Sequence, residues 1–117
     1  MSNSLALRCA AVLGASGVAL GAFGAHGLRG MVSEPEKIAA WESASRYQLV
    51  HAAALLALSA TGRRSLHTPL LWTAGTVMFS GSIYLLVLSR DRFRALGPVT
   101  PLGGLLMIAG WLSLLAP

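Results

Sequence analysis

Charged side chains are scarce in this sequence: only 11% of its 117 residues are Asp, Glu, Lys or Arg, whereas 55% are hydrophobic. An ordinary soluble domain has about a quarter of its residues charged, so this chain lacks the polar surface that water requires. A chain that faces lipid needs no polar surface at the depth of the bilayer. The composition therefore predicts an integral membrane protein.

Acidic residues and cysteine are scarcer still, with four Asp and Glu residues and one cysteine, Cys9. A single cysteine excludes an internal disulfide and a cysteine-based metal cage. The nine Lys and Arg residues contribute to a net charge of +5, and almost all of them fall between the apolar runs, where basic residues orient helices and meet headgroups. They do not cluster with aromatic residues on one face, so we expect no nucleic-acid partner.

The chain has four apolar runs, and their lengths can be compared with the roughly 20 residues that a helix needs to cross the hydrocarbon core. The predicted spans cover residues 5–25, 46–61, 68–89 and 96–116. Short connections make neighbouring helices antiparallel. The sequence thus predicts a single all-α domain over residues 1–117, an antiparallel bundle of four transmembrane helices. The first run also resembles a secretory signal peptide, but its length and glycine content favour a retained helix.

The second run is short, and a polar stretch with helix-start signals precedes it. Ser33 and Glu36 have the spacing of a capping box, and Pro35 is suited to a first helical turn. We expect a short interfacial helix before the second span, continuous with it or nearly so.

The basic residues also predict the orientation. One side of the membrane would carry Arg29, Lys37, Arg46, Arg90, Arg92 and Arg94, and the other Arg8, Arg63 and Arg64. Because Lys and Arg accumulate on the cytoplasmic side, this distribution places both termini on the non-cytoplasmic side.

Glycines recur every three or four residues along the first span and fall on one helical face. This stripe comprises Gly14, Gly17, Gly21 and Gly24. Small residues let a second helix approach closely, so the stripe fits either packing within the chain or a homo-oligomer interface. Gly103 and Gly104 in the fourth span, together with Gly110, and Gly75 with Gly81 in the third, predict similar contacts.

A few polar side chains lie in or next to the apolar runs. The candidate cluster comprises His26, Tyr47, Gln48, His51, Ser80 and Thr100. If the second span begins near residue 46, His26 and His51 lie at similar depth and could meet, as a locking pair, a proton or solute relay, or a bis-histidine ligand set. Thr100 would cap the helix that Pro101 opens.

The serines of the third span, Ser80 and Ser82, have neither a base nor an orienting acid beside them. We therefore expect them to bond backbone or a neighbouring helix. Tyr84 lies within the same apolar layer and needs a partner for its hydroxyl.

Four motifs, GAFGAHGL, RYQLVHAAALLAL, FSGSIYLLVLS and LGPVTPLGGLLMIAGWL, occur in this order. They resemble the small bacterial inner-membrane family known as domain of unknown function 423, to which mitochondrial transmembrane protein 256 is similar. The resemblance implies four membrane helices with no assigned activity, and it matches the family's residues to Gly21, Gly24, His26, Gly27, His51, Pro101, Gly103, Gly104 and Trp111. Many relatives have a tyrosine immediately before the second histidine, where this chain has Val50.

The sequence as a whole favours a non-enzymatic membrane protein without a cofactor or bound metal. We expect an accessory or scaffold subunit, or a homo-oligomer, whose partners are lipid and other membrane proteins or copies of itself. The alternative is a small carrier or channel for a proton or solute that uses Tyr47, Gln48 and His51. An enzyme or haem protein would depend on His26 and His51 alone.

Overall fold

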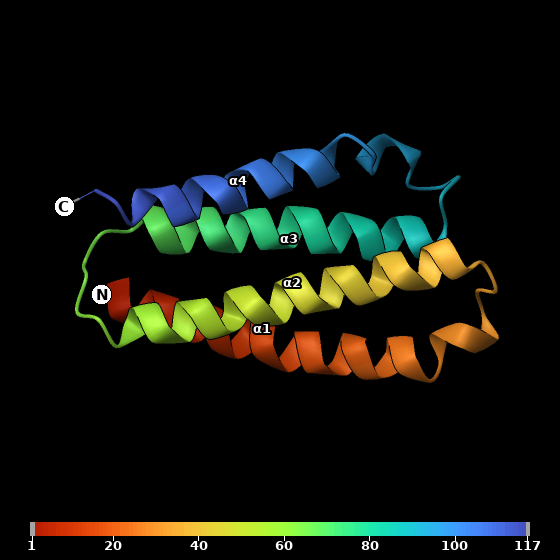
Figure 1. Cartoon of the computed structure of the whole chain (residues 1–117), viewed down its shortest axis with the longest axis horizontal. Coiled ribbons are helices and arrows are strands. Elements are labelled where there is room, and N and C mark those ends of the chain that lie inside the picture. The colour runs from red at the N-terminus through yellow and green to blue at the C-terminus, as the bar shows by residue number, and fades with distance from the viewer. Residues whose placement is uncertain (1, 117) are drawn as a thin grey trace.

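The structure is a computed structural model that describes residues 2–116, and in this range the chain forms four α-helices. They are α1 (Ser2–Ala25), α2 (Pro35–Ser59), α3 (His67–Leu88) and α4 (Val99–Ser113). Two short 3₁₀ helices, η1 (Leu28–Gly30) and η2 (Arg94–Leu96), lie in the loops after α1 and α3. Consecutive helices run in opposite directions (Figure 1).

The second helix runs unbroken for 25 residues. The polar stretch and the second apolar run are therefore one helix, and no separate helix precedes residue 46. Pro35 opens α2 as predicted, but Glu34 rather than Ser33 is the N-cap residue, and no side chain caps the helix. The reason is local: a proline forces the residue before it into an extended conformation, and Glu34 has a ψ of 121°.

The fourth helix begins two residues before Pro101. Pro98 already has helical backbone angles (φ −67°, ψ −19°) and is the N-cap residue. Thr100 therefore lies inside the first turn and is not the cap that the sequence predicts. Between α2 and α3 the chain reverses at Gly62, whose φ of 77° is readily adopted only by glycine.

Three segments are long and apolar enough to cross a membrane: Ser4–Ala25, His67–Leu88 and Arg94–Ser113. These correspond to the first, third and fourth predicted spans. The second predicted span lies in α2, which is long enough but carries charged residues along its first half.

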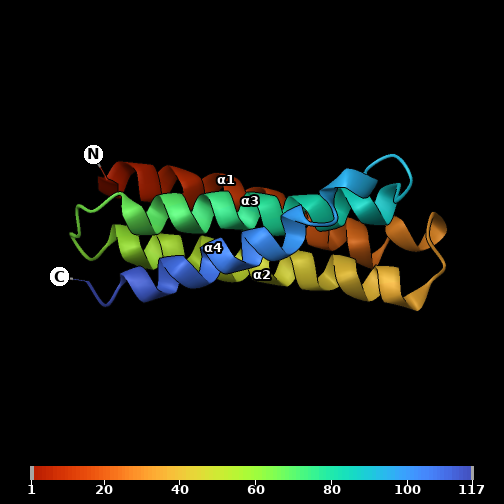
Figure 2. The same cartoon turned by 90° about the horizontal axis from the view of Figure 1, so that it is seen from above.

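The four helices form a thin, staggered row. The main helix contacts are α1 with α2, α2 with α3 and α3 with α4. Figure 1 shows α1 and α4 at opposite edges, and in the view from above in Figure 2 α4 crosses obliquely over α3. The molecule measures 46 × 26 × 18 Å. It therefore consists of two helical hairpins, α1–α2 and α3–α4, joined along α2 and α3.

The buried apolar side chains form two separate clusters. One comprises Ala6, Ala10, Leu13, Ala52, Leu55, Leu58 and Trp72. The other comprises Leu28, Val32, Trp41, Ala44, Tyr84 and Val87. Between them along α2 and α3 lie the buried polar residues Ser45, Gln48, His51, Thr76 and Ser80. The middle of this apolar protein is thus its most polar internal layer.

Candidate functional site

The glycine stripe of α1 lies against α2. Gly14, Gly17, Gly21 and Gly24 face, in turn, Ala52, Leu49, Ser45 and Trp41. A Cβ added to Gly14 would make an ordinary contact with Ala52 at 3.8 Å, whereas one added to Gly24 would overlap the Trp41 ring. Trp41 also donates a hydrogen bond from Nε1 to the Leu20 carbonyl at 2.8 Å. Helix α2 of the same chain covers the stripe, so the structure supports packing within the chain and not a homo-oligomer interface at this face.

The α3–α4 contact is closer. A Cβ on Gly75 would lie 2.8 Å from the Gly103 carbonyl oxygen, and one on Gly103 would lie 2.8 Å from the Gly75 carbonyl oxygen. Gly110 makes room for the Trp72 ring. Gly104 lies beside the contact, where a Cβ would meet Phe79 at 3.8 Å. Gly81 faces open space, so the predicted contact there is absent.

Gln48 is the centre of the buried polar layer. Its Nε2 donates to the Leu13 carbonyl at 3.0 Å and to Ser16 Oγ at 2.7 Å, both on α1. Its Oε1 accepts a hydrogen bond of 2.7 Å from the Tyr84 hydroxyl on α3. One amide therefore links three helices, and Tyr84 has the hydroxyl partner that its position requires.

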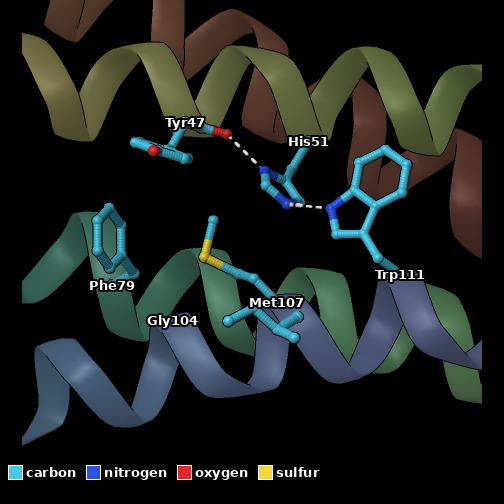
Figure 3. A pocket seen from close by; sticks show the side chains of 7 residues that line it. Tyr47, His51, Phe79, Gly104, Met107 and Trp111 are labelled. Carbon is cyan, nitrogen blue, oxygen red and sulfur yellow. Dashed lines mark hydrogen bonds between the residues drawn. The ribbon is translucent and has the colours of Figure 1, made fainter.

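His51 faces the other side of α2, toward α3 and α4 (Figure 3). Its Nδ1 donates to the Tyr47 carbonyl at 2.8 Å, and its Nε2 accepts from Trp111 Nε1 at 3.0 Å. Because a ring nitrogen that accepts carries no proton, these bonds correspond to the neutral ring with its proton on Nδ1. The ring also lies edge-on to Trp72, with ring centres 6.0 Å apart.

The remaining cluster residues have partners of their own. Ser80 donates to the Ala44 carbonyl at 2.7 Å, which joins α3 to α2. The Thr100 hydroxyl is hydrogen-bonded to that of Ser82, between α4 and α3. The Tyr47 ring is half exposed and packs edge-on against Phe79, with ring centres 5.3 Å apart. The six candidates are therefore distributed over several helix contacts and do not form one site.

The structure does not bring His26 to His51. His26 is exposed directly after the end of α1, whereas His51 lies about 24 Å along α2 from Pro35, at 1.5 Å per residue. The depth expected for His51 assumed a span that starts near residue 46, and the helix starts eleven residues earlier. A bis-histidine site has no geometric basis, and residues 2–116 contain no group of three or more potential metal ligands.

A groove opens between α2 and α4 beside His51, with a volume of about 320 Å³. Its lining, drawn in Figure 3, comprises Tyr47, His51, Phe79, Gly104, Met107, Ile108 and Trp111. The lining is almost entirely apolar, and the imidazole is engaged on both nitrogens. The groove therefore fits an apolar occupant.

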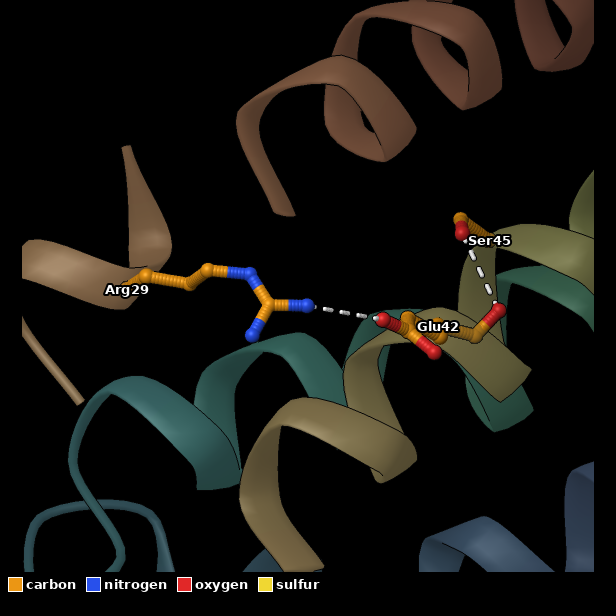
Figure 4. A network of polar contacts seen from close by, with 3 residues as sticks. All are labelled: Arg29, Glu42 and Ser45. Carbon is orange, nitrogen blue, oxygen red and sulfur yellow. Dashed lines mark hydrogen bonds and ion pairs between the residues drawn. The ribbon is translucent and has the colours of Figure 1, made fainter. Parts of the chain in front are cut away.

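Ion pairs gather at the end of the molecule that holds η1 and η2. Arg29 contacts Glu42 at 3.5 Å across the α1–α2 connection, and Ser45 donates to the Glu42 carbonyl (Figure 4). Lys37 contacts Glu34 at 2.8 Å. The hydrogen bond from Lys37, with its positive charge, lowers the pKa of the Glu34 carboxyl below its ordinary value.

An all-helical chain with three helices that are long and apolar enough to span a bilayer belongs to the class of helical membrane proteins. The chain belongs to the family described as protein of unknown function (DUF423), which matches residues 20–104. The resemblance found in the four sequence motifs is thus confirmed.

Two relatives with about the same sequence identity to this chain are named UPF0382 membrane protein. One from Staphylococcus aureus is 42% identical over 104 residues, which cover 84% of this chain and 81% of the relative. One from Schizosaccharomyces pombe is 41% identical over 112 residues, which cover 91% and 94% of the two chains. No solved structure matches the chain. Similar proteins therefore occur in a bacterium and in a yeast, and both of these relatives are named as membrane proteins.

Three polar contacts in the structure could not be predicted from the sequence. Trp111 as the partner of His51, the Trp41 bond to Leu20 and the Arg29–Glu42 ion pair each join residues that are far apart in sequence. A tryptophan is the only signal of the first two: Trp111 lies inside an apolar run, and Trp41 lies in the polar stretch before the second run. The third carries no local signal, because its partners lie on different elements.

Proposed function

We propose that this chain is a non-enzymatic membrane protein that serves as an accessory or scaffold subunit, assembling with other membrane proteins or with copies of itself. The single observation that carries the proposal is the groove between α2 and α4. These two helices are bridged by the Trp111–His51 bond, and beside that bridge the row of helices is open over Phe79, Gly104 and Met107. Small residues beside flexible apolar ones suit the approach of another helix.

The proposal treats all four helices as membrane spans in an antiparallel arrangement. α2 is as long as α1 and lies beside it, with the α1 glycines against it along its length. The 46 Å length of the molecule matches a bilayer with its headgroup regions, about 40–45 Å. On this basis the first turns of α2, with Glu36 and Lys37, lie at the interface. The bacterial inner membrane, with both termini on the non-cytoplasmic side, fits the distribution of basic residues.

A carrier or channel is the second candidate, and the position of His51 at a groove is the observation in its favour. Against it stand the hydrogen bonds of the polar layer. Gln48, His51 and Ser80 are each bonded to protein groups, whereas a solute path needs polar groups that are free to exchange partners.

The test is photocrosslinking in the native membrane from Ile108, which lines the groove and is 57% exposed. Leu102 is the matched control, since it lies on the same helix, is 53% exposed and is outside the groove. We expect adducts of one or two defined masses from Ile108, either a second copy or a protein identified by mass spectrometry, and few from Leu102. A monodisperse monomer in mild detergent, with no protein adduct from Ile108, would overturn the proposal.

The carrier alternative is tested with purified protein in vesicles. The scaffold proposal predicts that proton leak stays at the level of protein-free vesicles, both for the native chain and for His51→Ala. Leak that requires the native chain and disappears in His51→Ala would favour the carrier instead.

A further inference from the structure

A second groove lies at the charged end of the molecule, between the first turns of α2, the last turns of α3 and the start of α4. Its volume is about 310 Å³. Its lining includes four apolar residues, Ala40, Ile83, Leu86 and Val87, and the charged residues Glu36, Lys37 and Arg90. It is thus an amphipathic groove with an apolar part and a charged part.

Two further polar groups at this groove are already engaged. Lys37 is paired with Glu34 at 2.8 Å, and the Thr100 hydroxyl is bonded to Ser82. Glu36 and Arg90 are both exposed and make no ion pair within residues 2–116. The charges left for a ligand are therefore one carboxylate and one guanidinium.

The groove would lie at the level of the lipid headgroups. Arg90 lies two residues beyond the end of α3 at Leu88, and α3 is long and apolar enough to span the membrane. Leu86 and Ile83 lie about one and about two turns further in than Arg90, at acyl-chain depth. The groove therefore presents its charges to headgroups and its apolar wall to acyl chains.

We propose that this groove binds a phospholipid whose headgroup carries a primary ammonium, as phosphatidylethanolamine does. Arg90 binds the phosphate, because a guanidinium matches phosphate oxygens in two parallel hydrogen bonds. Glu36 accepts hydrogen bonds from the ammonium, and an acyl chain lies along Ile83 and Leu86.

The charge pair selects against the other common headgroups. Phosphatidylglycerol has a phosphate for Arg90 but no ammonium, so its net negative charge meets an unpaired Glu36 carboxylate. The quaternary ammonium of phosphatidylcholine has no N–H to donate to Glu36. We therefore expect retention in the order ethanolamine, then choline, then glycerol headgroups.

The experiment is native mass spectrometry of the full chain released from nanodiscs of equal parts phosphatidylethanolamine and phosphatidylglycerol, with the retained lipids counted by mass. Arg90→Gln should reduce ethanolamine-lipid retention about fivefold, the upper range for an exposed ion pair. Glu36→Gln should reverse the preference toward phosphatidylglycerol, because the groove then carries one positive charge. A general loss of folding would not produce this reversal.

Arg92→Gln is the matched control, since Arg92 lies two residues further, over the Phe93 ring and outside the groove. It should leave both lipids at the native level. The proposal is overturned if Arg92→Gln acts like Arg90→Gln, or if Glu36→Gln leaves the lipid ratio unchanged. These outcomes concern lipid alone, so they are independent of whether Ile108 crosslinks to a protein partner.

Discussion

In each of the hairpins α1–α2 and α3–α4 a tryptophan ring packs against a glycine of the other helix, but the two tryptophans differ in their hydrogen bonds. Trp41 covers Gly24 and donates its indole hydrogen to Leu20. Trp72 covers Gly110 and is 2% exposed, but its Nε1 has no partner within the described residues. At Trp41 close packing is thus combined with a hydrogen bond from the indole, whereas Trp72 is held by packing alone, and the hydrogen bonds of its hairpin lie elsewhere, as between Thr100 and Ser82.

The glycines at the two helix contacts also differ in what they face. In α1 they face side chains of α2, and the largest of these, Leu49 and Trp41, can move to some degree. In α3–α4, Gly75 and Gly103 face each other's backbone, which cannot move without moving the helix. The α3–α4 contact should therefore be the less tolerant of any added atom, and the α1–α2 contact the more dependent on its polar partners.

Gly103→Ala should have the largest effect. The new methyl group meets the backbone of Gly75 and Phe79, so the helices must separate, and we expect unfolding free energy to fall by about 3 kcal/mol. Thermal unfolding in detergent measures this change. Gly104→Ala is the control, with room for a methyl group at 3.8 Å from Phe79, and should be nearly neutral. Equal losses in the two variants would contradict the backbone-to-backbone contact.

Gln48→Leu should have the next largest effect, about 2 kcal/mol, because it removes interhelical hydrogen bonds and leaves the buried Tyr84 hydroxyl without its partner. Adding Tyr84→Phe should recover part of the loss, since the orphaned hydroxyl is then removed as well. A double-mutant cycle measured by chemical unfolding checks this. Strictly additive losses would show that the bond between α2 and α3 contributes nothing.

His51→Phe should cost about 1 kcal/mol, as expected for one interhelical hydrogen bond in a membrane protein. Trp111→Phe removes the same bond from the other side. The two changes together should therefore cost less than the sum of the separate losses. Independent effects would place the strength of the α2–α4 connection in ring packing instead of in the bond.

The smallest effect should come from the Lys37–Glu34 pair, which is exposed and screened by salt. Because the pKa of Glu34 is lowered in the folded chain, its ionised form stabilises the fold at neutral pH, and this contribution is lost as pH falls through the folded pKa. Unfolding followed from about pH 6 to pH 3 should show a slightly smaller decline for Glu34→Gln than for the native chain.

Helix positions could be predicted from the sequence more readily than helix contacts. Apolar runs place α1, α3 and α4 within a few residues, and Pro35 marks the start of α2, because both signals are local. The glycine spacing also predicts that one face of α1 approaches another helix. What periodicity cannot supply is which polar residues meet, as the separation of His26 from His51 demonstrates. That depends on where α2 begins relative to the membrane and on the rotation of each helix about its axis.

In the candidate site, too, the buried polar residues could be predicted from the sequence, whereas most of their partners could not. Gln48, His51 and Ser80 are recognised by being polar in apolar surroundings, and all three are buried. Their partners include three backbone carbonyls, those of Leu13, Tyr47 and Ala44, and a backbone carbonyl carries no distinguishing sequence signal. The charged groove at Glu36 and Arg90 joins residues more than fifty positions apart, so only the fold reveals it.

The 18 Å thickness of the molecule has a consequence for handling it. A protein this thin has a large surface for its volume. Such a protein depends on the surrounding solvent for much of its cohesion. Its melting temperature should therefore vary more with the choice of detergent or lipid than with most single substitutions on its outer faces.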